Sequence, residues 1–208
     1  MSHSNALMGR TLIALAILAS LLSFAKFSHC ENTGWATPDQ YIHACYSDLP
    51  SLYEARGLSS NQWPYASADN SVEYPVLTGV VMYLTSFAAN SPASYFNINT
   101  FFLILLFIAT AAVVRRIRPE FAYLVPVAPA MIASLFINWD LWAIATMLLA
   151  IYWFDRKQFL NSALLMGVSI STKFLPISYS FQLFSSCGAK TKLKKRLNTL
   201  QSPLAPGC

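Results

Sequence analysis

The sequence predicts an all-α polytopic membrane protein with about five transmembrane helices and an extracytoplasmic loop that carries an interfacial helix. The 208 residues are 55% hydrophobic and only 11% charged, and the apolar residues fall in long blocks, which is typical of membrane spans. The net charge of +5 comes from Lys and Arg at the ends of these blocks, where basic residues fix membrane orientation. No basic stripe interleaved with aromatic residues is present, so we do not expect nucleic acid as a partner.

The first segment, residues 1–27, contains an apolar block over residues 11–27 that follows Arg10. Two interpretations fit this block. In the first, the block belongs to a cleaved signal peptide, because Ser23 and Ala25 are placed like the small residues of a cleavage site. We favour an uncleaved first transmembrane helix, with Lys26 extending its ammonium group to the interface.

Four further apolar blocks predict a four-helix transmembrane region over residues 96–177. Arg115, Arg116 and Arg118 follow the first of these blocks, and a second basic cluster follows the third. Under the positive-inside tendency both clusters mark cytoplasmic ends. The blocks are residues 101–114 extended by 97–100, residues 121–137 with Pro126 and Pro129 tolerated inside the helix, residues 141–154 followed by Arg156 and Lys157, and residues 159–177.

Residues 72–90 are also apolar enough to cross a membrane, but the basic residues argue against a crossing. With a cytoplasmic N-terminus, a crossing here would place both later basic clusters outside. A helix that lies in the outer interface, or dips in and returns, keeps Arg10 and both clusters inside while the acidic segment stays outside. We therefore expect residues 72–90 to form an interfacial helix.

An extracytoplasmic loop over residues 28–95 holds six of the nine carboxylates, between Glu31 and Glu73, together with one arginine, Arg56. Tyrosines and tryptophans lie between these acids. Two interpretations remain open on composition. The loop is either a belt of interfacial aromatic residues with solvated acids, or it holds one carboxylate at the lip of a membrane cavity as a general base, with aromatic rings stacked on a sugar or a lipid head group.

An ordered series of motifs runs through residues 10–177. The segments "YSDLPSLYEARGL", "PY" and "VEYPVLTG" are followed by an apolar span that ends in arginines, then by "NWDLWAIA" and "STKFLP". In order and spacing this series resembles the N-terminal half of the GT-C glycosyltransferases that take mannose from a polyprenyl-phosphate carrier. It is most similar to actinobacterial membrane mannosyltransferases and the integral membrane proteins grouped with them. The resemblance implies a multi-pass protein of the bacterial plasma membrane.

The resemblance also implies roles for individual residues. Asp48 in "YSD" matches the loop aspartate that acts as the base on the acceptor hydroxyl, with a solvated loop acid as the alternative. Lys173 in "TKFLP" matches a lysine at the lipid phosphate, with a lysine at a helix end as the alternative, and Arg56 would assist it. The other matching substrate-binding residues are Glu73 and Tyr74, in an element that lacks one family proline, and Asn138 and Asp140 in the outer turn, where Asp140 alternatively serves as a helix N-cap.

The activity implied is hexose transfer, of mannose by resemblance, from a polyprenyl-phosphate-linked sugar to a lipid or glycan acceptor on the extracytoplasmic face, with inversion at the sugar carbon. No motif indicates a cofactor, and the need for a divalent cation is left open. The alternative function is that of a non-catalytic membrane scaffold or glycolipid-binding subunit. A transporter is disfavoured because few ionisable residues lie within the spans and no internal repeat is visible.

Cysteines and histidines add two expectations. Cys30 and Cys45 both fall in the predicted outer loop, where an oxidising compartment permits a disulfide, but the sequence does not assign the pairing of the four cysteines. His3, His29 and His43 show no metal-ligand spacing, so we expect no zinc site.

The last segment, residues 178–208, departs from the pattern that the resemblance implies. Family members continue with several further spans after the "KFLP" element, whereas this segment is a Lys-rich tail. On the predicted topology the tail would begin outside, against the positive-inside tendency. Three explanations fit: residues 176–184 turn the last span back, the predicted topology is wrong, or the tail is truncated or out of frame relative to its parent. We favour the last, under which the chain would be an inactive fragment.

Overall fold

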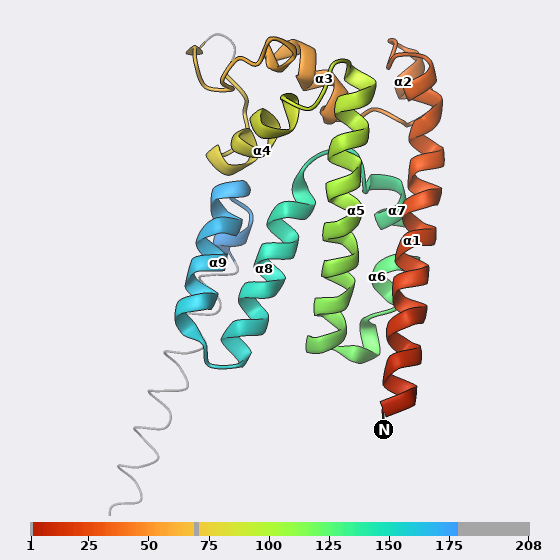
Figure 1. Cartoon of the computed structure of the whole chain (residues 1–208), viewed down its shortest axis with the longest axis vertical. Coiled ribbons are helices and arrows are strands. Elements are labelled where there is room, and N and C mark those ends of the chain that lie inside the picture. The colour runs from red at the N-terminus through yellow and green to blue at the C-terminus, as the bar shows by residue number, and fades with distance from the viewer. Residues whose placement is uncertain (1, 69–70, 179–208) are drawn as a thin grey trace, which may run out of the picture. The chain divides into compact units, whose positions relative to one another are not determined.

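The structure is a computed structural model that describes residues 2–68 and 71–178, and within these residues every regular element is a helix (Figure 1). The all-helical class is therefore confirmed. Residues Met1–Phe174 form one compact unit; of the second unit, which begins at Leu175, residues 175–178 are described. The predicted basic tail thus lies almost entirely outside the described residues. The helices are α1 (Ser2–Asn32), α2 (Asp39–Ile42), α3 (Asp48–Ala55), η1 (Leu58–Ser60), α4 (Val76–Ser86), α5 (Pro92–Ile117), η3 (Pro119–Phe121), α6 (Leu124–Val127), α7 (Pro129–Ser134), α8 (Asp140–Asp155) and α9 (Phe159–Thr172).

Two of the described helices are long and apolar enough to cross a membrane. They are Ala6–Asn32 within α1, of 27 residues, and α5, of 26 residues. At about 1.5 Å per residue, each is longer than the hydrocarbon core of a bilayer, which is roughly 30 Å thick. Helices α8 and α9 have only 16 and 14 residues, so they fall short of that thickness. Of the five predicted spans, two are therefore present at full spanning length among the described residues.

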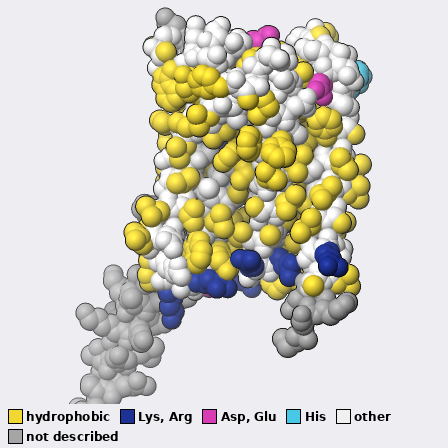
Figure 2. Space-filling view, in the orientation of Figure 1, with side chains coloured by type: hydrophobic (Ala, Val, Ile, Leu, Met, Phe, Trp, Pro, Cys, Tyr) yellow, Lys and Arg dark blue, Asp and Glu magenta, His cyan; other side chains and the backbone are white. Residues whose placement is uncertain are grey.

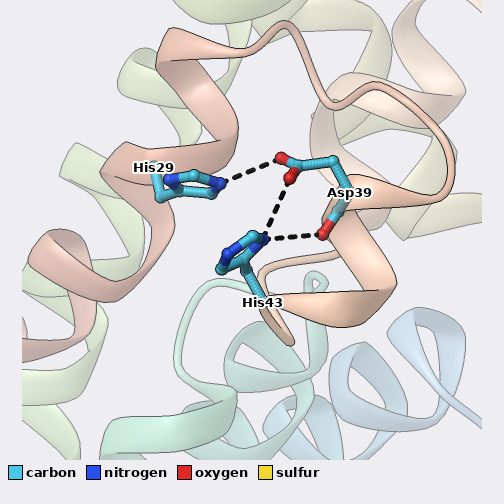
Figure 3. A group of neighbouring side chains, drawn as sticks. All are labelled: His29, Asp39 and His43. Atoms are coloured by element: carbon cyan, nitrogen blue, oxygen red, sulfur yellow. Dashed lines mark hydrogen bonds and ion pairs between the residues drawn. The ribbon is translucent and has the colours of Figure 1, made fainter.

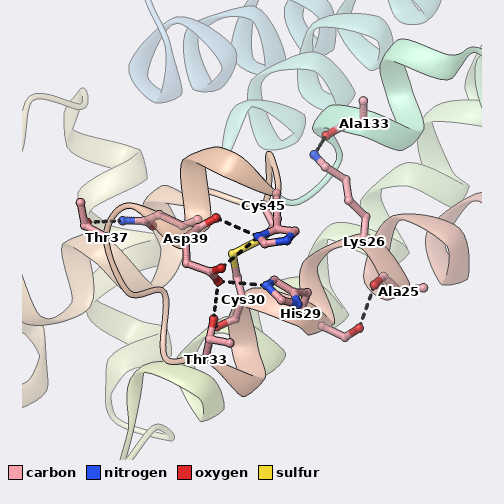
Figure 4. Close-up of a disulfide and its surroundings, with 12 residues drawn as sticks. Ala25, Lys26, His29, Cys30, Thr33, Thr37, Asp39, Cys45 and Ala133 are labelled. Carbon is pink, nitrogen blue, oxygen red and sulfur yellow. Dashed lines mark hydrogen bonds and ion pairs between the residues drawn. A yellow bond between two sulfur atoms is a disulfide. The ribbon is translucent and has the colours of Figure 1, made fainter.

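The predicted span over residues 121–137 is broken into the short helices η3, α6 and α7. Pro129 has no N–H to continue a helix, and Ala128 before it is extended, with φ −67° and ψ 122°. The prediction that this block tolerates its prolines within one spanning helix is therefore wrong. The Lys26 ammonium of α1 donates to the Ala133 carbonyl of α7 at 2.6 Å (Figure 4). Lys26 thus has a backbone partner on α7, and its position at a membrane interface stays a prediction.

Helix α4 is the part of residues 72–90 that becomes helical. It has 11 residues, about 17 Å in length, which is too short to cross a bilayer. Pro75 precedes it, in an extended conformation. Thr78 of α4 donates its hydroxyl to the carbonyl of Thr172 at 2.7 Å, one of the last carbonyls of α9, which have no partner within their own helix. Helix α4 is therefore attached to the end of α9 (Figure 1).

Charged and apolar side chains are separated along the bundle. Figure 2 shows Lys and Arg gathered at one end, Asp, Glu and His toward the other, and apolar side chains between them. The basic end is where α1 begins, α5 ends and α8 meets α9 (Figure 1). The Arg115 guanidinium lies against Gly9, so the first two basic segments meet there. The exposed apolar side chains include Leu18, Leu21, Phe101, Leu105 and Leu164.

A buried aromatic core joins α1, α5 and the turn before α8. Phe96 packs against Phe27 and Phe136, with ring centroids 5.9 and 6.3 Å apart. Trp139 is 1% exposed, and its Nε1–H donates to the Asn99 side-chain oxygen at 2.7 Å. These contacts fix the turn at residues 136–139 against the N-terminal third of α5.

A disulfide joins Cys30, near the end of α1, to Cys45, which lies between α2 and α3 (Figure 4). Both cysteines are fully buried. The pairing that the sequence left open is thereby assigned for these two residues. The bond ties the end of α1 to the segment that leads into α3.

We expect removal of this disulfide to destabilise the protein by roughly 3 kcal/mol, because it closes a loop of 15 residues and so restricts the unfolded chain. The variant is Cys30→Ala with Cys45→Ala, and the measurement is denaturant unfolding in detergent followed by circular dichroism. Cys187→Ser with Cys208→Ser serves as the background for both samples. Equal stability of the two samples, or alkylation of Cys30 and Cys45 without reductant, would contradict the expectation.

Candidate functional site

Asp48 is the first residue of α3, and its backbone is fixed against the turn that precedes α8. The Asp48 N–H donates to the Ile137 carbonyl at 2.7 Å. Ser47, the N-cap of α3, accepts a hydrogen bond from the Leu49 N–H at 3.2 Å and donates its own hydroxyl to the Phe136 carbonyl at 2.7 Å. Capping and two long-range bonds therefore set the position from which the Asp48 side chain projects.

Two tyrosine hydroxyls hold the Asp48 carboxylate. Tyr46 donates to Oδ1 at 2.7 Å, and Tyr74 donates to Oδ2 at 2.6 Å. Burial raises the pKa of Tyr46 to about 12, with further contributions from the hydrogen bond to Asp48 and from its charge. Burial and the same carboxylate raise the pKa of Tyr74 further above its usual value. Both tyrosines thus remain donors at neutral pH, and they orient the carboxylate without using all of its acceptor positions.

Tyr74 also connects Asp48 to the turn before α8. The Tyr74 ring meets the Trp139 ring edge to face, with centroids 5.8 Å apart. The negative charge of Asp140 contributes to the raised pKa of Tyr74. Tyr74 therefore contacts both Asp48 and the turn before α8.

Asp140 forms an ion pair with Lys173, the residue that ends α9. The two side chains are 38% and 35% exposed, so solvent can reach the pair. The alternative role of Asp140 as the N-cap of α8 is wrong: the N-cap is Trp139, and Asp140 is the first helical residue. Asn138 supplies the local bond instead, its side-chain oxygen accepting from the Asp140 N–H at 3.0 Å.

Arg56, at the end of α3, pairs with Glu73 in a second ion pair. The Arg56 side chain is 23% exposed and that of Glu73 is 69% exposed. The Arg56 Nε–H is buried and finds no hydrogen-bond acceptor among the described residues. This pair adjoins the first cluster through the peptide that links Glu73 to Tyr74.

A small and mostly apolar pocket lies beside Asp140, between α7 and α8. Its volume is about 150 Å³. Asn138 and Asp140 supply polar groups at a wall that is otherwise largely aliphatic. The lining residues are Met131, Ser134, Leu135, Ile137, Asn138, Asp140, Leu141 and Ile144.

The structure therefore brings the seven predicted site residues to one end of the bundle. Asp48 accepts a hydrogen bond from Tyr74, and Tyr74 packs against Trp139, the residue before Asp140. Asp140 pairs with Lys173 and is supported by Asn138, while Arg56 and Glu73 form an adjoining pair. Sequence reasoning did not identify the roles of Tyr46, Ser47 and Trp139. For Tyr46 and Ser47 the signal lay in "YSD" itself, a donor and an N-capping residue beside the acid.

Comparison of the chain with models of protein families, with curated proteins and with solved structures found no match.

The Tyr46 hydroxyl provides a direct probe of the Asp48 site. The phenolate absorbance of Tyr46, taken as the difference between wild-type and Tyr46→Phe titrations, should develop near pH 12. In Asp48→Asn it should develop at lower pH, because a hydrogen-bonded negative charge is removed. Since the folded protein holds this proton more tightly than the unfolded chain, the stabilisation due to Tyr46 is complete below pH 10 and is lost as the pH rises toward 12. A difference titration centred near pH 10 would contradict the hydrogen bond.

Proposed function

We propose that this chain is a multi-pass membrane glycosyltransferase that moves a hexose, mannose in the first instance, from a polyprenyl-phosphate carrier to a hydroxyl of a lipid or glycan acceptor. The observation that carries the proposal is the Asp48 carboxylate, held by two tyrosine hydroxyls at the same end of the bundle as two cations, Lys173 and Arg56. A transfer of this kind needs a base for the incoming hydroxyl and cations for the departing phosphate.

The proposed reaction is a single displacement with inversion. The acceptor oxygen forms a bond to the anomeric carbon of the sugar while the bond from that carbon to the phosphate oxygen breaks. The acceptor proton passes to Asp48, and the electron pair of the broken bond leaves with the polyprenyl phosphate. Tyr46 and Tyr74 orient the carboxylate that receives the proton, because a general base must lie within hydrogen-bond reach of the proton it takes.

The donor phosphate would bind to cations that are already in place. Lys173 and Arg56 each have a carboxylate partner and each keep N–H groups for a further acceptor. The buried Nε–H of Arg56, which lacks an acceptor among the described residues, is the donor with most to gain from a phosphate oxygen. The site thus holds two cations and three carboxylates, Asp48, Glu73 and Asp140. A donor phosphate would add further negative charge, and a bound divalent cation would help to balance it.

The proposal places the protein in a bacterial plasma membrane with the acidic end outside. The Lys and Arg cluster at the opposite end of the bundle supports this orientation (Figure 2). Helices α8 and α9, which are shorter than a bilayer core, would cross the membrane beside α1 and α5 with help from the residues that flank them. The aliphatic pocket beside Asp140 offers a place for the first isoprene units of the carrier.

A second function, glycolipid binding by a non-catalytic membrane subunit, is supported by one feature of the same site. Both Asp48 oxygens already accept a tyrosine hydroxyl, and such a group can serve to tie the outer loop to the bundle without any chemistry. The two functions differ in whether sugar is transferred.

The test is transfer of labelled mannose from polyprenyl-phosphate-mannose in membranes that contain the chain, against membranes without it. Lys173→Gln should lower kcat/KM by about 10²-fold, since a charged donor to the leaving phosphate is lost. Lys157→Gln, a neutralised and exposed lysine at the basic end, should leave the rate unchanged. If both variants transfer mannose at the same rate, Lys173 does not act in the site. If the wild-type chain transfers no mannose, only the binding function remains.

A further inference from the structure

His29, Asp39 and His43 form a compact cluster at the outer end of α1, apart from the Asp48 site (Figure 3). One ligand atom from each residue lies within 4.8 Å of the others. His29 Nε2 lies 2.9 Å from Asp39 Oδ2, and His43 Nδ1 lies 3.0 Å from Asp39 Oδ1. Both imidazoles thus direct a ring nitrogen at the same carboxylate.

The cluster depends on tertiary structure. His29 is in the last turn of α1, while Asp39 begins α2 and His43 is its C-cap, four residues later. The Cys30–Cys45 disulfide brings α1 and α2 together, because Cys30 follows His29 directly and Cys45 lies two residues after His43 (Figure 4). The expectation of no zinc site rested on the spacing of the histidines along the chain. In the structure, however, His29 and His43 lie close together around Asp39.

We propose that His29, Asp39 and His43 bind a divalent transition-metal ion of the zinc type, with solvent completing the coordination. Two imidazole nitrogens and one carboxylate oxygen form a ligand set common to zinc and iron(II) sites. Calcium and magnesium prefer oxygen ligands and fit the two imidazoles poorly. The side chains are 44%, 30% and 48% exposed in chain order, so an ion and its water ligands can reach them.

Two further contacts prepare the cluster for a metal. The Thr33 hydroxyl donates to Asp39 Oδ2 at 3.0 Å, an outer hydrogen bond of the kind that orients carboxylate ligands. This hydrogen bond is the largest cause of the lowered pKa of Asp39. The His29 and His43 rings lie 4.0 Å apart between centroids. Neutral imidazole is the form that binds metal.

Metal binding at this cluster would replace the present hydrogen bonds. Each neutral imidazole must offer the lone pair of the nitrogen that faces Asp39, so its proton must reside on the other ring nitrogen. A protonated imidazole must first release a proton to solvent. Zinc and protons thus compete for the same two nitrogens, and the Asp39 carboxylate neutralises one of the two positive charges of the ion.

The experiment is isothermal titration of zinc chloride into the full chain, purified in detergent through a tag without histidine and stripped with a chelator. We expect about one zinc per wild-type chain. His29→Ala and Asp39→Asn should each weaken the apparent Kd at least tenfold, and Thr33→Val by about tenfold, as for outer-contact changes at other metal sites. Zinc should also raise the melting temperature of the wild type but not of His29→Ala.

His3→Ala is the matched control, since it removes a histidine about 40 Å away along α1 at 1.5 Å rise per residue. It should bind zinc like the wild type. Asp39→Asn keeps the shape of the side chain, so it decides the question if His29→Ala does not fold with the wild-type circular dichroism. Absence of saturable zinc binding by the wild type, or equal affinity in wild type and Asp39→Asn, would overturn the site.

Discussion

Asp48→Asn is expected to lower mannose transfer by about 10²- to 10⁴-fold, the range typical for loss of a general base. The amide has nearly the shape of the carboxylate but cannot take the acceptor proton. Tyr46 and Tyr74 donate to different oxygens of Asp48. In the variant, one tyrosine can donate to the amide oxygen while the other accepts from the amide NH2 group, so the loop keeps part of its attachment. The measurement is the rate of transfer in membranes that contain wild type or variant at matched abundance.

Glu54→Gln is the matched control for Asp48→Asn, because Glu54 lies on the same short helix but is exposed to solvent. It should transfer mannose at the wild-type rate. Equal activity of Asp48→Asn and wild type would exclude Asp48 as the base. If Asp48→Asn lowers the melting temperature and the wild type transfers no sugar, the carboxylate serves to hold the loop, as the glycolipid-binding function requires.

Trp139→Ala is expected to destabilise the protein by about 3–5 kcal/mol, the usual cost of truncating a fully buried aromatic side chain. Trp139 is 1% exposed, and its N–H donates to the buried Asn99 of α5. The substitution leaves a cavity and removes a partner from that amide, which cannot reach water. The measurement is the free energy of unfolding in detergent, from denaturant titration followed by circular dichroism.

Trp63→Ala is the control for this substitution, since Trp63 is 39% exposed and its removal opens no buried cavity. Its effect should be well below that of Trp139→Ala. Because Trp139 precedes Asp140 and contacts Tyr74, Trp139→Ala should also lower transfer more than the stability loss alone predicts. A change in unfolding free energy below about 1 kcal/mol would contradict the packing of Trp139.

The sequence predicted helix type and approximate position well where apolar blocks were long and uninterrupted. α5 extends from Pro92 to Ile117, five residues before the predicted start, because Ser91 and Ser94 form a capping box there. The prediction of one spanning helix over residues 121–137 was wrong. Two prolines there remove backbone donors, and whether neighbours compensate is decided by packing that a linear pattern does not contain.

The sequence predicted which residues belong to the candidate site better than it predicted the contacts between them. Asp48, Tyr74, Asp140 and Lys173 were chosen on motif order, and they do converge in the structure. Their partners could not be predicted. Tyrosine hydroxyls reach Asp48 from two residues before it and from 26 residues after it, and nothing in residue type marks that second separation.

The sequence by itself determined what depends on composition and on local order: the helical class, the apolar surface, the division between a basic and an acidic end, and the capping residues that start individual helices. Tertiary structure alone decided which of the outer-loop side chains meet. The Cys30–Cys45 bond and the buried Trp139–Asn99 hydrogen bond set the separations between helices. Side-chain chemistry acts over about 3 Å, so both the Asp48 cluster and the His29–Asp39–His43 cluster exist only once those distant segments are packed.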